Sequence, residues 1–341
     1  MNRTDVGFFS SPIGLGHATR DIAIAQFFDR ISSKFVTGSG AAKIISEYGF
    51  DVTDAYVPPN FDVKDGALHG SLGWLWRYYQ YYKDCKKTAQ EFVENEKPRL
   101  VVTDEDFASA VIAQQKKITT ILITDVLQTN FTKGIGSIVE KKMNKSMKEI
   151  IKRCDVVIIP EFGEDQENIK RVGPIVRSTT HTREEIRSKL SFNKKTITVS
   201  VGGTDVGRFL IQKTVEACSK LKGDFDLLVV SGPSLKLENK ENIRNLGFVN
   251  NLHEIIYASD LVVSLAGKST IDESKAYGTP GIFIPIKNHF EQEDNARQEG
   301  YSFDDVFRLE SLISEKLESK RTPLHTEGAK KASQIIAEHL K

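Results

Sequence analysis

The sequence contains few cysteines and no long apolar run. Cys85, Cys154 and Cys218 are the only cysteines in 341 residues. Their wide spacing, without a CxxC pair, argues against a disulfide framework and against a cysteine zinc site. No apolar stretch approaches the ~20 residues of a membrane-spanning helix, and the N-terminus is typical of a strand and turn rather than a signal peptide. We therefore expect a cytoplasmic protein with reduced thiols.

An excess of charge of one sign is also missing. The 47 Lys and Arg residues nearly balance 46 Asp and Glu residues, which leaves a formal charge of +1. No overall field favours nucleic acid, so no nucleic-acid partner is expected. Aliphatic runs recur along the chain and argue against disorder. The length favours two domains.

Short β-rich segments alternate with segments of helical period, which predicts parallel sheets with crossover helices. The alternation restarts after Gly173-Pro174, a pair that breaks helix and strand alike. We therefore predict an α/β protein with two Rossmann-like, doubly wound domains that face a cleft. The first domain covers 1–172 and the second 173–325, and a C-terminal helix over 326–341 returns to the first domain.

The expected strands are 5–10, 34–37, 51–57, 99–103, 119–124 and 155–159 in the first half, and 195–201, 226–231, 243–247, 260–264 and 280–285 in the second. The expected helices are 18–31, 40–48, 73–95, 106–116 and 137–152, then 182–191, 206–222, 252–258, 268–277, 291–299 and 326–340.

A glycine-rich loop, Gly14-Leu15-Gly16-His17, follows the first strand and leads into a helix. Glycines permit a tight turn, and free N–H groups at a helix start favour an anion. Thr19 stands where a dinucleotide motif needs its third glycine, which argues against a nicotinamide site. His17 titrates near neutrality and is the candidate catalytic base. The structural alternative is a histidine that only caps the loop or packs.

In the second half, a strand ends at Gly267 and a helix begins. Its first amides are placed to bind a diphosphate, with hydroxyls from Ser269 and Thr270. Glu273 follows one helical turn later and can accept hydrogen bonds from ribose hydroxyls. Acidic residues near a helix start also complement its dipole, which is the alternative for Glu291 and Glu273. The complete set of donor-binding candidates is Gly14, Gly16, Gly202, Gly203, Thr204, Phe248, Val249, Gly267, Lys268, Ser269, Thr270, Glu273, Glu291 and Gln292.

Acidic residues end two predicted strands of the first half, at Asp104 and at Asp125. Either can orient His17 through its second ring nitrogen or act as the base itself. Helix capping is the alternative for any one of them. No acidic pair is placed to bridge phosphates through a metal ion, so we expect neither a metal nor another cofactor.

Two helices have unusual compositions. Residues 74–82 are rich in aromatics, and Leu75, Tyr78, Tyr79 and Tyr82 share one helical face, which predicts core packing. The other aromatics are candidates for an acceptor groove or a membrane contact. A second helix is locally basic, which is typical of a solvated face but also attracts anionic lipid headgroups. Its basic residues are Lys141, Lys142, Lys145, Lys148, Lys152 and Arg153.

These motifs resemble the GT-B fold of nucleotide-sugar glycosyltransferases, most specifically family 28, which includes the peptidoglycan N-acetylglucosaminyltransferase. The resemblance rests on 14–17, on 202–204 and on 247–296. It implies that the main chain at Phe248 and Val249 reads uracil, that Glu273 binds ribose, and that Glu291 and Gln292 contact the donor sugar. The chain departs from the family in its shorter glycine run and in having Glu291 where Gln is usual.

The resemblance implies a metal-independent, inverting glycosyltransferase. It would move a sugar from a UDP-sugar, with UDP-GlcNAc as one candidate, to a hydroxyl of a glycan or lipid-linked acceptor. The basic helix adds peripheral contact at the inner face of the membrane as an alternative to a solvated face. The segment Gly14–Arg20 is also similar to nucleotide-sugar hydrolases of the pseudaminic acid pathway, in which His17 would activate water. A UDP-sugar-binding subunit without activity is the third hypothesis.

Overall fold

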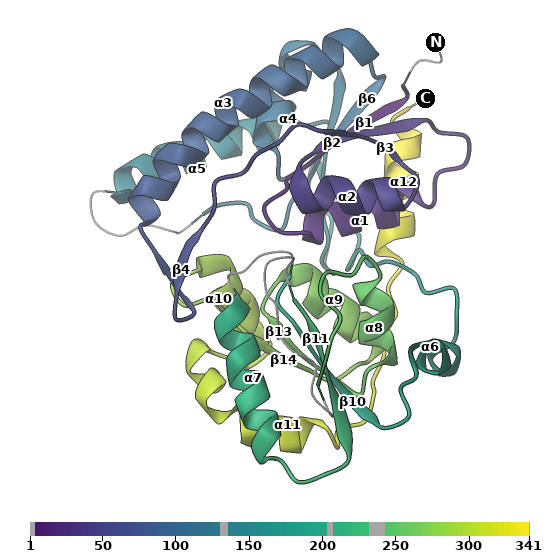
Figure 1. The fold of residues 1–341 in the computed structure, drawn as a ribbon. Coiled ribbons are helices and arrows are strands. Elements are labelled where there is room, and N and C mark those ends of the chain that lie inside the picture. The colour runs from purple at the N-terminus through teal and green to yellow at the C-terminus, as the bar shows by residue number, and fades with distance from the viewer. Residues whose placement is uncertain (1–3, 130–135, 203–206, 232–242, 341) are drawn as a thin grey trace. The chain divides into compact units, whose positions relative to one another are not determined.

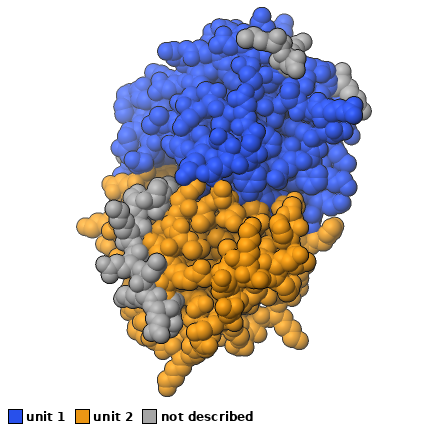
Figure 2. Space-filling model, turned by 45° about the vertical axis from the view of Figure 1, so that its right-hand side comes forward, with its two compact units in different colours: residues 1–60, 70–177, 326–341 blue, residues 61–69, 178–325 orange. Residues whose placement is uncertain are grey.

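A computed structural model describes residues 4–129, 136–202, 207–231 and 243–340 (Figure 1). The chain divides into two compact units, which Figure 2 shows in different colours. Unit 1 comprises residues 1–60, 70–177 and 326–341, and unit 2 comprises residues 61–69 and 178–325. Each unit is built on a parallel sheet with helices, so the predicted α/β class is confirmed.

Unit 1 contains a parallel sheet of seven strands in the order β3-β2-β1-β6-β7-β8-β9. The chain runs outward from β1 to β3, then returns to the other side of β1 and continues outward, as in a doubly wound sheet. The strands are β1 (Val6–Ser10), β2 (Ser33–Thr37), β3 (Asp51–Asp54), β6 (Leu100–Asp104), β7 (Thr119–Ile123), β8 (Val156–Ile159) and β9 (Ile169–Arg171).

The helices of unit 1 are α1 (Gly16–Ala25), α2 (Ser39–Glu47), α3 (Ser71–Glu96), α4 (Phe107–Gln115), α5 (Gly136–Arg153) and α12 (Gly328–Glu338). The C-terminal helix α12 lies beside α1, so the chain end returns to the first unit (Figure 1). Its apolar face includes Ala329, Ala332 and Ile336, all of which are buried. The apolar periodicity of the last helix therefore reflects real packing.

Unit 2 contains a parallel sheet of five strands in the order β12-β11-β10-β13-β14. Its strands are β10 (Lys195–Ser200), β11 (Phe225–Val230), β12 (Ile243–Asn245), β13 (Leu261–Leu265) and β14 (Gly281–Ile284). Its helices are α6 (Arg183–Leu190), α7 (Arg208–Lys220), α8 (Leu252–Ala258), α9 (Lys268–Tyr277), α10 (Phe290–Gln298), the 3₁₀ helix η2 (Phe303–Arg308) and α11 (Leu309–Lys316).

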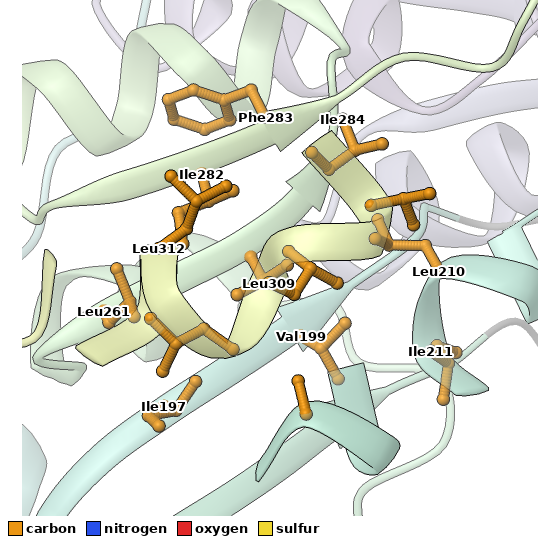
Figure 3. Close-up of a cluster of buried hydrophobic side chains, with 14 of the residues drawn as sticks. Ile197, Val199, Leu210, Ile211, Leu261, Ile282, Phe283, Ile284, Leu309 and Leu312 are labelled. Carbon is orange, nitrogen blue, oxygen red and sulfur yellow. The ribbon is translucent and has the colours of Figure 1, made fainter. Parts of the chain in front are cut away.

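One face of the unit 2 sheet forms its main hydrophobic core (Figure 3). Ile197 and Val199 of β10 and Leu261 of β13 point to this face, because alternate strand residues share a side. Leu309 and Leu312 of α11 pack against them. Burial of one such side chain contributes ~1.5–3 kcal/mol to folding. This core fixes the strand ends from which the loops of unit 2 emerge.

The units differ from the predicted domain limits in two places. Residues 173–177 belong to unit 1, where the Thr326 hydroxyl donates a hydrogen bond of 2.7 Å to the carbonyl of Pro174. Residues 61–69 belong to unit 2, where Leu68 and Lys287 are joined by a backbone hydrogen bond of 2.8 Å. The boundary at 172/173 misses both contacts because each joins segments distant in sequence.

Several short elements were not predicted. Two of them, the strands β4 (Asp62–Lys64) and β5 (Ala67–His69), form an antiparallel hairpin. The other elements that were not predicted are β9, η2 and α11. The first helix ends at Ala25 rather than near Ile31, because a turn follows it and Arg30 adopts a positive φ of 59°. A left-handed residue of this kind does not continue an α-helix.

Candidate functional site

In unit 1 the loops of interest leave the sheet where its strand order reverses. Strands β1 and β6 are neighbours, and Ser10 lies opposite Asp104 at their carboxyl ends. Ligands of open α/β sheets bind at this switch point. Gly14, in the loop after β1, has a φ of 84°, which favours glycine. The loop therefore turns back and begins α1 at Gly16 beside the end of β6.

His17 and Asp104, both predicted as catalytic, are in direct contact. The Nδ1–H of His17 donates a hydrogen bond of 2.8 Å to Oδ1 of Asp104. Asp104 is fully buried, whereas His17 keeps 16% of its side chain exposed. The bond fixes the ring orientation and leaves Nε2 as the nitrogen available to another molecule. This is the geometry of a base with its orienting carboxylate.

Arg20, one turn after His17 on α1, joins the two predicted carboxylates. Its Nε donates to Oδ2 of Asp104 at 2.7 Å, and its Nη1 donates to both oxygens of Asp125, at 2.8 and 2.9 Å. Its side chain is 5% exposed. Asp125 therefore does not touch His17 directly in this arrangement; it neutralises the guanidinium that also holds Asp104. The sequence places Arg20 at the end of the Gly14–Arg20 motif but does not predict that its side chain joins Asp104 and Asp125.

Glu105, between two aspartates, lies on the other side of the imidazole. Its Oε2 is 3.9 Å from Nε2 of His17. Its Oε1 accepts hydrogen bonds from the hydroxyl of Thr124, at 3.1 Å, and from the backbone N–H of Asp125, at 3.0 Å. The residue has a φ of 51°, which a residue other than glycine rarely adopts. Such backbone strain concentrates at functional sites.

Charge controls the pKa values of this group. Burial acts to lower the pKa of His17, but the charge and hydrogen bond of Asp104, with the charge of Glu105, raise it to about 9. Burial acts to raise the pKa of Asp104, but Arg20 and His17 hold it well below its ordinary value. At neutral pH the pair is therefore an imidazolium and a carboxylate. His17 must lose its Nε2 proton before it can accept another.

Asp21 provides a second buried carboxyl beneath the site. It is fully buried and hydrogen bonded to the Ser10 hydroxyl through Oδ2. Within the described residues its Oδ1 has no hydrogen-bond partner. Burial and the nearby charge of Asp104 raise its pKa well above the usual value. The raised pKa of Asp21 favours its protonated form, which carries no negative charge next to Asp104.

In unit 2 the segment around Gly267 has the predicted strand-to-helix geometry. Strand β13 ends at Leu265, and α9 begins at Lys268 with Gly267 as its N-cap. Lys268, Ser269 and Thr270 form the first turn, where helix N–H groups lack intrahelical partners. This segment can therefore bind an anion.

Two charged residues of α9, Lys268 and Glu273, expose little of their side chains. The ammonium group of Lys268 lies 2.6 Å from both oxygens of Asp272, one turn along the helix. Its charge is thereby paired near the predicted diphosphate position. Glu273 is 4% exposed, so a ribose could reach only a narrow edge of its carboxylate.

The start of α10 holds the predicted sugar-contacting pair. Gln292 accepts a hydrogen bond of 3.0 Å from the backbone N–H of Ile286 through Oε1, so its NH₂ group is the part left for a ligand. Glu291 is half-buried. His289 caps the helix by accepting from the N–H of Gln292 at 3.5 Å. Burial lowers the pKa of His289 to about 4, so this cap is neutral.

The remaining donor-binding candidates lie at other strand ends of unit 2. Gly202 follows β10 and is exposed, whereas Gly203 and Thr204 lie outside the described residues. Phe248 and Val249 are half-buried after β12, and Val249 packs against a small hydrophobic cluster. The described candidates of unit 2 thus lie at the ends of β10, β12, β13 and β14 of one sheet, whereas Gly14 and Gly16 belong to unit 1.

The aromatic and basic helices agree with the predictions in part. Tyr78 and Tyr82 are half-buried on α3, but Tyr79 is 49% exposed and lies under the ammonium of Lys83, 4.5 Å from its ring centroid. The prediction that Tyr79 packs in the core is therefore wrong. The six basic side chains of α5 are all exposed.

Metal-binding clusters and membrane-spanning helices are both absent from the described ranges. There, no three His, Cys, Asp or Glu side chains are grouped as a metal-binding cluster. Over the same ranges, no helix has both the length and the apolar character that crossing a bilayer requires.

Comparison with solved structures gives the class of protein. The glycotransferase of kitacinnamycin matches with a TM-score of 0.68 and 15% identity, over 100% of both chains. This likeness concerns the fold, and it confirms the GT-B architecture. A relative named as a glycosyltransferase also matches most of the chain's length. The chain is therefore a glycosyltransferase of the GT-B fold.

Sequence comparison shows which proteins the chain is similar to. Residues 196–338 match the model of the glycosyltransferase family 28 C-terminal domain. An uncharacterized glycosyltransferase of Methanosarcina acetivorans is 28% identical over 84% of this chain and 82% of its own length. The UDP-N-acetylglucosamine–N-acetylmuramyl-(pentapeptide) pyrophosphoryl-undecaprenol N-acetylglucosamine transferase of Caldicellulosiruptor saccharolyticus is 24% identical over 87% of this chain and 83% of its own. Another relative, from Methanopyrus kandleri, matches over 60% of its length.

Proposed function

We propose that the protein transfers a sugar from a UDP-sugar to an acceptor hydroxyl, with inversion at the anomeric carbon and without a metal ion. The observation that carries this proposal is the His17–Asp104 hydrogen bond at the switch point of unit 1. The relative from Caldicellulosiruptor saccharolyticus, named for its use of UDP-N-acetylglucosamine, supports a UDP-linked donor. We propose UDP-GlcNAc as the first donor to test.

His17 acts as the general base in this proposal. Its Nδ1–H stays bonded to Asp104, and Nε2 takes the proton of the acceptor hydroxyl. As that proton leaves, the acceptor oxygen forms a bond to the anomeric carbon, and the bond from that carbon to the diphosphate breaks. The electron pair of the broken bond leaves with UDP. The base contributes about 10²–10⁴-fold to the rate.

Unit 2 binds the donor in this proposal. The amides at the start of α9 and the hydroxyls of Ser269 and Thr270 would meet the diphosphate, whose negative charge grows as the sugar departs. Phe248 and Val249 would contact uracil through their main chain, and Glu273 the ribose. Gly202, Gly203 and Thr204 would supply further donors, and Glu291 and Gln292 would contact the sugar.

The acceptor is a hydroxyl of a glycan or of a lipid-linked molecule, the second by analogy with the undecaprenol-linked acceptor in the name of one relative. The exposed basic face of α5 would bring the protein to anionic lipids at the inner face of the membrane. Sedimentation with vesicles of phosphatidylglycerol tests this contact, and reversal of α5 lysines to Glu should abolish it.

The function itself is tested with a panel of UDP-sugars. A thermal-shift screen identifies the donor, and chromatography then measures UDP release with and without a lipid extract from cells. We expect acceptor-dependent release. Equal release without acceptor would instead show a nucleotide-sugar hydrolase, and binding without release would show a binding subunit.

The variant that tests the base is His17→Ala. We expect at least a hundredfold loss of turnover with an unchanged Kd for UDP, since His17 belongs to unit 1 and the donor candidates at the start of α9 to unit 2. The matched control is His181→Ala, because His181 is exposed and distant in sequence from every candidate residue. Turnover within a few-fold of wild type would move the base to Asp104 or Asp125.

A further inference from the structure

A segment from the first half of the chain packs beside the proposed sugar-contacting residues of unit 2. The hairpin of β4 and β5 lies within residues 61–69, which belong to unit 2 although the residues before and after them belong to unit 1. It contacts the β14–α10 connection, residues 285–289 (Figure 1). Glu291 and Gln292 follow this connection in the first turn of α10. The hairpin therefore reaches the segment that leads into the proposed sugar contacts.

The first turn of α10 holds part of this connection. The backbone N–H of Ile286 donates to Oε1 of Gln292 at 3.0 Å, and the N–H of Asn288 donates to Oε1 of Glu293 at 2.8 Å. Asn288 has a φ of 67°, a conformation that persists only where the surroundings hold it. The orientation of the Gln292 side chain therefore depends on the position of the connection.

The hairpin binds the residue between these two. The N–H of Lys287 donates to the carbonyl of Gly66, and the carbonyl of Lys287 accepts from the N–H of Leu68, both at 2.8 Å. Lys287 thus pairs with the hairpin as one residue of a parallel strand does. Its chain neighbours, Ile286 and Asn288, are the residues that bond to α10. A shift of the hairpin would therefore move both bonds.

Side-chain packing fixes the hairpin at its start and at its turn. Phe61 packs against the imidazole of His289, with ring centroids 5.6 Å apart, and His289 is the N-cap of α10. Gly66 has a φ of 76°, and a Cβ added to it would lie 2.8 Å from Phe209 and 2.9 Å from Phe303. A residue larger than glycine would therefore push the turn away from unit 2.

We propose that the hairpin is a positioning element for the donor sugar. Phe61 acts through His289, and the hairpin backbone acts through Lys287. Both contacts set the direction of the Gln292 NH₂ group, because Oε1 of the same side chain is bonded to the connection. An NH₂ group held in one direction favours a sugar with an acceptor oxygen in reach. The contact with the sugar rests on the proposed function, whereas the fixing of the connection by the hairpin does not.

Hydrogen exchange with mass spectrometry, on the full chain without ligand, measures whether the hairpin fixes the connection. We expect exchange over residues 286–289 to be about tenfold faster in Phe61→Ala and in Gly66→Ala. Lys64→Ala is the control for the hairpin, because Lys64 is exposed on β4. Gly49→Ala is the control for strain, because Gly49 has a φ of 83° and no atom within 4 Å of an added Cβ. Wild-type exchange in both hairpin variants overturns the proposal.

Calorimetry with UDP-GlcNAc and with UDP measures the effect on the sugar. Phe61→Ala should weaken UDP-GlcNAc binding about fivefold, as the loss of one hydrogen bond does, and leave the Kd of UDP within about twofold. Phe61→Leu should restore most of the loss, because it keeps an apolar side chain against His289. An equal loss for UDP and UDP-GlcNAc overturns the proposal. Unchanged UDP-GlcNAc affinity together with faster exchange also overturns it.

The two measurements separate this proposal from the proposed function. If the wild-type protein binds neither UDP nor UDP-GlcNAc, the proposed function is contradicted and the role in sugar binding falls with it. The exchange result then still decides whether the hairpin fixes the connection. If both ligands bind and only the hairpin variants behave like the controls, the proposed function stands and the positioning role alone is wrong.

Discussion

Arg20 grips both carboxylate oxygens of Asp104, with Nε 2.7 Å from Oδ2 and Nη2 2.5 Å from Oδ1. The two residues are 84 positions apart in the chain and both are buried. A forked guanidinium matches a carboxylate in this way, which a lysine cannot do. The pair therefore fastens the start of α1 to the end of β6.

The first prediction concerns stability. Arg20→Gln should lower the free energy of unfolding of unit 1 by about 3–5 kcal/mol, because it leaves the buried charge of Asp104 without its main partner. Urea denaturation monitored by circular dichroism measures the change. Arg30→Gln is the control, since the Arg30 side chain is 93% exposed. An equal, small change in both variants would contradict the structural role of the Arg20–Asp104 pair.

The second prediction concerns pH. The free enzyme must lose the Nε2 proton of His17, whose pKa is about 9, so kcat/KM should rise with pH and level off above about pH 9. Asp104 raises this pKa, so Asp104→Asn should shift the rising limb to lower pH and also reduce the maximum rate. Initial rates from pH 6 to 10 test both effects. A profile whose midpoint stays fixed in Asp104→Asn would show that another group titrates.

The same proton affects stability. The folded protein binds it more tightly than the unfolded chain, because the pKa of His17 is raised above the ordinary 6.5. This contribution is complete below about pH 6.5 and is lost as pH rises through about 9. The decline should disappear in His17→Ala. Unfolding free energies measured at pH 6 and pH 9.5 show whether it does.

A third prediction concerns the donor. Asp272→Asn should tighten UDP binding by about fivefold, because it releases the ammonium of Lys268 toward the diphosphate and such a pair is worth on the order of 1 kcal/mol. Glu273→Ala should weaken UDP binding, through loss of the ribose contact. Calorimetry measures both affinities. Glu216→Ala, on the exposed side of α7 in the same unit, is the control.

A fourth prediction concerns metal ions. Treatment with EDTA should leave turnover unchanged, because helix amides and the proposed hydroxyl donors would carry the diphosphate charge. Loss of activity with EDTA and its return with Mn²⁺ would contradict the metal-independent mechanism.

The order of strands and helices was predictable because each long element has its own periodicity. Six of the seven strands of unit 1 and the loop before α1 follow from apolar runs separated by turns, whereas β9 was not predicted. The β4–β5 hairpin was missed, because each strand has three residues and no period can be recognised over that length. The Asp65-Gly66 pair was nevertheless a signal, since both residues have positive φ, as a two-residue hairpin turn requires.

The candidate site was predictable only as separate pieces. Strand ends indicated that Asp104 and Asp125 lie near His17, because parallel strands end at one edge. The sequence could not show which partner each carboxylate contacts. Asp104 is hydrogen bonded to the imidazole of His17, and Asp125 is hydrogen bonded to Arg20. Nor could the sequence show that Glu105 turns toward His17, because that depends on one left-handed backbone residue.

The β4–β5 hairpin has a consequence for cutting the protein apart. The chain passes from one unit to the other four times, after residues 60, 69, 177 and 325. A fragment starting at residue 178 would lack the hairpin, which hydrogen bonds to Lys287 and covers Phe209 and Phe303 through Gly66. Neither unit is therefore formed by one continuous segment of the chain. An exchange of unit 2 between related proteins would have to include the nine residues 61–69, which lie in the chain between two segments of unit 1.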